Sequence, residues 1–128
     1  MQGNHLYEYA VIRAVPCVER DEFVNVGVIL FCKRQKYIRT LYRVNEERIR
    51  SLSDDFDIDL LHNYLQAFSK VCDGAANCGP IARMDVPERF RWLTAVRSSS
   101  LQTTRPHPGF SPDLDKTLQA LFAEQVLL

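Results

Sequence analysis

The 128-residue sequence lacks the features that mark several large classes of protein. It contains no run of about 18 apolar residues, so no transmembrane helix is expected. Its N-terminus has no basic segment followed by an apolar core, so no secretory signal peptide is expected either. A phosphate-binding glycine loop, a dinucleotide-binding fingerprint and a Gly-x-Ser-x-Gly elbow are all absent. The commonest nucleotide-binding and serine hydrolase signatures are therefore excluded.

An excess of charge of either sign is also missing. The 16 basic and 16 acidic residues cancel, which argues against a general polyanion-binding protein. The four cysteines, Cys17, Cys32, Cys72 and Cys78, fit no zinc-binding spacing, so neither a metal nor another cofactor is expected. Cys32 and Cys72 lie in apolar patterns, where a free thiol behaves as a small apolar side chain. These observations favour a reduced, cytoplasmic protein.

What the sequence does contain is the composition of one globular domain over residues 1–128, with 46% hydrophobic and 25% charged residues. Residues 6–16 and 23–33 are rich in Val, Ile, Tyr and Phe without strict alternation, which predicts strands covered on both faces. The alternating pattern of residues 37–44 predicts an edge or half-exposed strand. Because the connections are short, the three strands are predicted to form an antiparallel meander.

Helical periodicity follows the three strands. Four helix starts are predicted, at Asn45, Asp57, Asp85 and Asp113. The second helix is predicted to run from about residue 57 to 73, with an apolar stripe at three- and four-residue spacing. Residues 95–103 could form a fourth strand or belong to a long loop. The fold class is therefore α+β: a three-stranded antiparallel meander, with a possible fourth strand near 95–103, packed by three to four helices.

Each of the two buried strands carries one polar residue that its neighbours do not explain, Arg13 in the first and Asn25 in the second. A buried polar group without a partner costs roughly 1–3 kcal/mol, so each residue needs a partner or a function. If Pro16 faces Phe23, the two polar side chains point to opposite faces of the sheet, whereas a slip of one residue places them side by side. The sequence leaves this register open.

Arg13 has three possible roles. It could bind an anion in a pocket, form an ion pair with an acid of the hairpin turn, or extend over Tyr7 and Tyr9. The turn itself holds Glu19, Arg20, Asp21 and Glu22, which could bind a hard cation or an arginine-rich partner. A charged and solvated hairpin tip is the commoner explanation of such a turn. Gly27, within the second strand, indicates a bulge or a tight helix–strand contact.

The stretch from Arg89 to Phe110 is rich in arginine and contains no acidic residue. Its donors include Arg97, Ser98, Gln102, Arg105 and His107, a combination that suits a phosphate or carboxylate site. A solvated loop between helices is the alternative. His107 and Ser98 could be drawn as a nucleophile pair, but no pattern fixes them within reach of each other. The sequence therefore favours a protein without enzymatic activity.

Three motifs resemble a bacterial family of proteins, domain-of-unknown-function family three-zero-three-seven. They are Tyr9-Ala-Val-Ile-Arg13, Glu22-Phe-Val-Asn-Val-Gly-Val-Ile-Leu-Phe31 and Phe90-Arg-Trp-Leu-Thr-Ala95. The resemblance runs from Tyr7 to Phe122 and transfers no catalytic residue. Members of the family are often encoded beside kinase-like proteins of the HipA type. The resemblance therefore implies a system of two proteins.

Two hypotheses follow. The first is a small cytoplasmic protein that acts as a non-enzymatic accessory or regulatory partner of a kinase-like protein. The second is a phosphate- or nucleic-acid-directed binder or enzyme that uses an arginine-rich site. No membrane partner is expected, and nucleic acid is the less favoured ligand. The candidate binding residues are Arg13, Glu22, Asn25, Arg97, Ser98, Gln102, Arg105 and His107.

Overall fold

The computed structural model describes residues 4–74, 79–95 and 100–127. Its strands and helices are β1 (His5–Cys17), β2 (Glu22–Cys32), β3 (Tyr37–Tyr42), α1 (Glu46–Leu52), α2 (Ile58–Cys72), α3 (Val86–Leu93), β4 (Leu101–Thr103), β5 (His107–Ser111) and α4 (Leu114–Phe122). Two 3-10 turns, η1 (Val18–Arg20) and η2 (Ile81–Arg83), and a π-helical turn, η3 (Ala123–Leu127), complete the described elements. The α+β class is confirmed.

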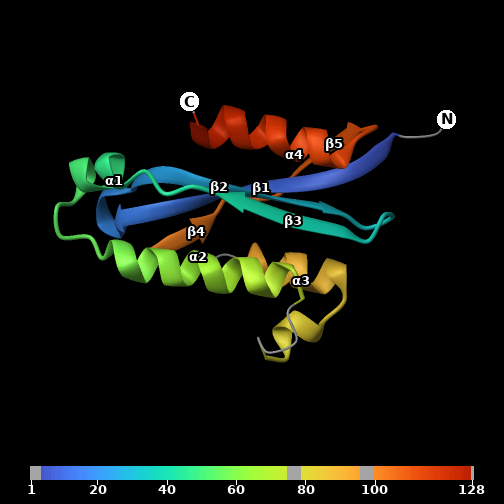
Figure 1. Ribbon diagram of the computed structural model, residues 1–128, viewed down its shortest axis with the longest axis horizontal. Helices are drawn as coiled ribbons and strands as arrows, with labels where there is room; N and C mark the ends of the chain where they lie inside the picture. The colour runs from blue at the N-terminus through green and yellow to red at the C-terminus, as the bar shows by residue number, and fades with distance from the viewer. Residues whose placement is uncertain (1–3, 75–78, 96–99, 128) are drawn as a thin grey trace.

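The five strands form one antiparallel sheet, with β1 in its interior (Figure 1). The strand order is β3-β2-β1-β4, and β5 pairs with the same edge of β1 as β4 does, nearer its N-terminal end. The predicted meander of β1, β2 and β3 is confirmed, and β3 lies at an edge as expected. A strand within residues 95–103 is confirmed as β4. The sequence pattern gave no sign of β5, because Pro108 and Gly109 disfavour a strand.

Helices cover both faces of the sheet, α2 and α3 on one side and α4 on the other (Figure 1). Consecutive residues of β2 alternate between the two cores: Ile29 packs in the cluster that includes α2, and Val28 packs in the cluster that includes α4. This burial on both faces explains the continuous apolar run of β2. It confirms the prediction that this strand is covered on both faces. No helix in the described part of the chain has the length and apolar character needed to cross a membrane.

Helix starts are fixed by short acidic or amide side chains, as predicted. The N-cap residues are Asn45, Asp57, Asp85 and Asp113, and each side chain accepts a hydrogen bond from the backbone N–H three residues further along. Each cap satisfies a donor that the helix itself cannot, and such caps contribute about 1 kcal/mol each. The predicted stripe of α2 is buried, and it consists of Ile58, Leu61, Leu65, Phe68 and Cys72.

A bulge at Val26 sets the register of β1 against β2. Ile12 pairs with Gly27, but Arg13 pairs with Asn25, so Val26 is the extra residue of β2. A Cβ atom at Gly27 would lie 2.7 Å from the carbonyl oxygen of Leu41 on β3. Glycine is therefore required for the close approach of β3, and the expected bulge near this residue is confirmed. The bulge places Arg13 and Asn25 side by side, which was one of the two registers left open.

Candidate functional site

A row of polar side chains crosses three strands of the sheet. Arg13 on β1 has Asn25 on β2 as its cross-strand partner on one side and Gln102 on β4 on the other. Directly paired residues of antiparallel strands share a face, so the three side chains lie on the same face of the sheet. The structure therefore brings together three of the candidate residues, although they are up to 89 positions apart in the numbering (102 − 13).

Arg13 packs on an aromatic ring. The central guanidinium carbon lies 3.8 Å from the centroid of the Phe23 ring, a cation–π contact, and Phe23 is 41% exposed. The Nε atom of Arg13 is buried and has no hydrogen-bond partner among the described residues. Arg13 thus extends over Phe23, and not over the two tyrosines of β1 that the sequence suggested. A ligand or a water molecule that accepts a hydrogen bond would satisfy its buried N–H group.

Asn25 joins the end of the chain to the sheet. Its Nδ2 donates a hydrogen bond of 2.9 Å to the carbonyl oxygen of Gln125 in η3. Its Oδ1 is buried and has no partner among the described residues. Next to Asn25 lies a polar hollow of about 130 Å³, lined by Asn25, Arg43, Asn45, Arg48, Val126 and Leu127. Arg43 and Arg48 were absent from the predicted set because residues 43 and 48 approach η3 only in the folded chain.

The remaining candidate residues lie elsewhere. The carboxylate of Glu22 forms an ion pair of 3.0 Å with Arg20 at the hairpin turn. Arg105 is exposed between β4 and β5. His107 lies opposite Tyr9, with the two ring centroids 5.4 Å apart, and Tyr9 is four residues from Arg13 along β1. Arg97 and Ser98 lie outside the described residues. The arginine-bearing stretch is thus distributed over α3, β4 and β5.

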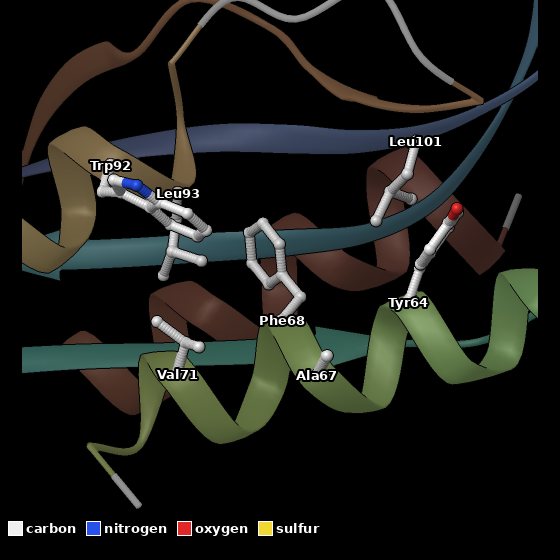
Figure 2. Close-up of a pocket in the computed structure, with 7 residues that line it drawn as sticks. All are labelled: Tyr64, Ala67, Phe68, Val71, Trp92, Leu93 and Leu101. Carbon is white, nitrogen blue, oxygen red and sulfur yellow. The ribbon is translucent and has the colours of Figure 1, made fainter. Parts of the chain in front are cut away.

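An apolar groove opens between α2, α3 and β4, on the face of the sheet away from α4. It has a volume of about 270 Å³, close to the lower end of the range for small-molecule pockets. Figure 2 shows Phe68 in its middle, with Trp92 and Leu93 on one side and Tyr64 and Leu101 on the other. The groove is lined by Tyr64, Ala67, Phe68, Val71, Trp92, Leu93 and Leu101.

Large apolar side chains on the rim of this groove face the solvent. Tyr64 is 42% exposed and Trp92 is 40% exposed, whereas Phe68 below them is buried. On α2 the exposed residues Leu60, Tyr64 and Ala67 follow spacings of four and three, and they form a second apolar stripe beside the buried one, to which Val71 belongs. This is the spacing of a seam between two packed helices. The spacing of this second stripe is present in the sequence. Sequence analysis identified only the core stripe, because the two stripes overlap along the same helix.

Three titratable groups of the described residues, Tyr37, Cys72 and Asp115, have pKa values shifted from their usual ones. Tyr37 donates a 2.7 Å hydrogen bond to the carboxylate of Asp115, which Arg39 also contacts at 3.1 Å. Burial and this hydrogen bond raise the pKa of Tyr37 well above its usual value. Burial raises the pKa of Cys72 to about 11, so its thiol is not an activated nucleophile. No group of three His, Cys, Asp or Glu side chains within the described ranges could hold a metal ion.

The fold and these surfaces define a class: an α+β protein whose five-stranded sheet is covered by helices on both faces and carries a polar row and an apolar groove. The model of a family described as "Protein of unknown function (DUF3037)" matches residues 9–126. The chain belongs to this family, which confirms the resemblance seen in the sequence. No curated protein and no solved structure matches the chain.

Proposed function

We propose that this protein is a non-enzymatic interaction protein that binds an amphipathic helix of a partner in the groove between α2, α3 and β4. One observation carries the proposal: the exposed residues Leu60, Tyr64 and Ala67 of α2 have the four-three spacing of a helix seam, and Trp92 borders the same groove. A partner helix with apolar residues at the matching spacing would continue the packing pattern of α2.

The composition of the groove supports this function. Tyrosine and tryptophan are enriched among the residues that contribute most to protein–protein binding, and both Tyr64 and Trp92 are about 40% exposed in the free chain. Complete burial of one large apolar side chain contributes roughly 1.5–3 kcal/mol. Phe68 and Leu93 form a buried floor under the rim, so the docking surface is preformed.

We further propose that the partner is the kinase-like protein that the family resemblance implies, and that binding takes place in the bacterial cytoplasm. The described cysteines, Cys17, Cys32 and Cys72, are all free thiols, which suits a reducing compartment. Regulation of the partner would follow if its bound helix belonged to a segment that moves during its activity.

The test is co-purification with the kinase-like protein encoded beside the gene, followed by calorimetric titration. The combined change Tyr64→Ala and Trp92→Ala should weaken the complex by at least about tenfold. Leu127→Ala is the matched control, because Leu127 is 47% exposed and lies on η3, across the sheet from the groove. A complex that tolerates the double variant would exclude the groove, and the absence of any complex would exclude this partner.

A second function, binding of a phosphate or carboxylate group, is favoured by a different observation. The buried Nε of Arg13 has no partner among the described residues, and Arg43 and Arg48 line the hollow next to Asn25. Titration with inorganic phosphate tests this function. Binding that falls steeply with salt and disappears in Arg13→Ala or Arg43→Ala would support it, whereas binding unaffected by both variants would exclude it.

A further inference from the structure

A second apolar surface lies at the end of the sheet that carries the β2–β3 turn, β5 and the N-terminal end of β1 (Figure 1). A hollow of about 590 Å³ opens here, lined by Asn4, Leu6, Lys33, Arg34 and Phe110. We call it the Leu6–Phe110 hollow. Leu6 and Phe110 lie directly opposite each other on β1 and β5, so their side chains share one face of the sheet.

These two side chains are unusually exposed. Phe110 is 66% and Leu6 is 56% exposed, the highest values among the exposed large apolar residues of the described part of the chain. Scattered single apolar residues on a surface need no explanation, but an adjacent pair at the edge of a hollow marks a contact surface. Neither residue belongs to the two cores, so their packing does not explain why they are apolar.

The β2–β3 turn supplies positive charge to the same hollow. It reads Lys33-Arg34-Gln35-Lys36 and contains no acidic residue. Among the described residues, no side-chain hydrogen bond or ion pair engages Lys33, Arg34 or Lys36. Two other exposed arginines are each paired with a carboxylate, Arg20 with Glu22 and Arg39 with Asp115. The turn is thus a cluster of uncompensated positive charge in a chain whose formal net charge is zero.

We propose that the Leu6–Phe110 hollow binds an acidic segment of a partner protein that carries an apolar side chain. The apolar side chain would lie between Leu6 and Phe110, and the flanking carboxylates would contact Lys33 and Arg34. Complementary charge selects an acidic partner and speeds its encounter. The concave shape favours a polypeptide over a lipid bilayer, because a side chain can fill a hollow whereas a bilayer takes up protruding residues.

This inference stands apart from the helix-binding groove. Leu6 and Phe110 belong to β1 and β5, whereas α2, α3 and β4 supply all the residues that line the groove. The two surfaces therefore have no lining residue in common. Failure of one surface to bind leaves the other unaffected, and variants of each surface serve as controls for the other.

The test is fluorescence anisotropy of the purified full chain with two labelled peptides, one of alternating aspartate and leucine and one of alternating lysine and leucine. Only the acidic peptide should bind saturably, and its affinity should fall as salt is added. Phe110→Ser should weaken binding by at least about tenfold, as should the combined change Lys33→Glu and Arg34→Glu. All these side chains are exposed, so the thermal unfolding midpoint should change little.

Matched controls separate the hollow from general effects. Leu60→Ser removes another exposed apolar side chain, and Lys70→Glu combined with Lys116→Glu reverses as many charges at other exposed positions. These variants should bind the acidic peptide like the unmodified chain. The proposal is overturned if the acidic peptide does not bind, or if the control and hollow variants weaken binding equally.

Two further measurements decide between occupants of other kinds. Sedimentation with phosphatidylserine vesicles tests for a lipid surface, and analytical ultracentrifugation of the chain alone tests for self-association. If Phe110→Ser abolishes vesicle binding or oligomer formation, and the acidic peptide does not bind, the hollow serves lipid or a second copy and the proposal is wrong. Binding of the acidic peptide alone, lost in the hollow variants, supports the proposal.

Discussion

Arg13 on β1 lies directly opposite Asn25 on β2, because the bulge at Val26 shifts the register of the two strands by one residue. The shift places two buried polar atoms, Nε of Arg13 and Oδ1 of Asn25, on one face of the sheet, each without a partner among the described residues. One is a donor and the other an acceptor. A group that can both accept and donate, such as an amide or a water molecule, would satisfy both atoms at once.

The close approach of β3 to β2 depends on Gly27, and this gives the first prediction. A methyl group in Gly27→Ala would lie 2.7 Å from the Leu41 carbonyl oxygen and 2.9 Å from Cβ of Tyr42. Both neighbours belong to the paired strand β3 and cannot move without disturbing the ladder. We expect the free energy of unfolding to fall by about 1–3 kcal/mol, as for other overpacked sites. Urea denaturation measures this change, and an unaltered midpoint would mean that β3 adjusts freely.

The second prediction concerns the link between Asn25 and η3. Asn25→Ala removes the 2.9 Å hydrogen bond to the Gln125 carbonyl oxygen, which should cost about 1 kcal/mol. Because this hydrogen bond joins η3 to β2, backbone amides of residues 123–127 should exchange hydrogen faster, while those of β2 remain protected. Asn63→Ala on the exposed face of α2 is the control. Equal exchange in all three proteins would argue against the link.

The third prediction concerns the start of α2. Asp57→Ala removes the acceptor for the Leu60 backbone N–H, now 2.9 Å from the carboxylate, and should lower the free energy of unfolding by about 1 kcal/mol. Asp57→Asn should retain most of the stability, since asparagine is an equally good cap. Asp59→Ala removes the same charge from the first helical turn without touching the cap. Equal losses for both alanine variants would indicate that charge alone matters.

The fourth prediction is a dependence of stability on pH that arises from Tyr37 and Asp115. The hydrogen bond from Tyr37 holds the pKa of Asp115 below its ordinary value of 3.8, so this pair stabilises the fold above that pH. The contribution is lost as the pH falls through the lowered pKa of the folded state. In alkali the second group matters, because burial and the hydrogen bond to Asp115 raise the pKa of Tyr37. Tyr37 therefore contributes stability to the fold that is complete below pH 10.0, the ordinary pKa of tyrosine, and is lost as the pH rises through the raised pKa of the folded state.

Tyr37→Phe tests both effects, because it removes the hydroxyl but keeps the ring. The difference in denaturation midpoint between the unmodified chain and the variant should be largest near neutral pH and should shrink in strong acid and in strong alkali. Tyr64→Phe, on the rim of the groove, is the control and should show no such dependence. A difference that is constant from acid to alkali would contradict the assignment.

The fifth prediction concerns thiol reactivity. Cys32 and Cys72 are fully buried, and burial raises the pKa of Cys72 to about 11, whereas Cys17 is partly exposed. Iodoacetamide should therefore modify Cys17 in the native protein and leave Cys32 and Cys72 protected until denaturant is added. Mass spectrometry of peptides from native and denatured samples gives the extent of modification at each site. Rapid native alkylation of Cys72 would require frequent opening of α2.

The features that the sequence predicted correctly are those with local causes. Asp57 and Asp113 predict where α2 and α4 begin, because an N-cap needs only a side chain and the backbone N–H groups of the first helical turn. The three-stranded meander follows from short connections and from apolar runs that only a doubly covered strand explains. The candidate residues Arg13 and Asn25 could be identified from the sequence because each is a polar residue within an apolar run. Gln102 could be identified because it lies in a stretch without acidic residues.

The sequence by itself therefore determined the α+β class, the helix starts and the central meander, since each depends on residues close together in the chain. Only the tertiary structure decided that Gln102 joins Arg13 and Asn25 in one row, that β5 exists despite Pro108, and that the Leu6–Phe110 hollow forms. These features depend on pairing between distant segments. A shift of one residue, such as that at Val26, changes which side chains meet without altering any local pattern.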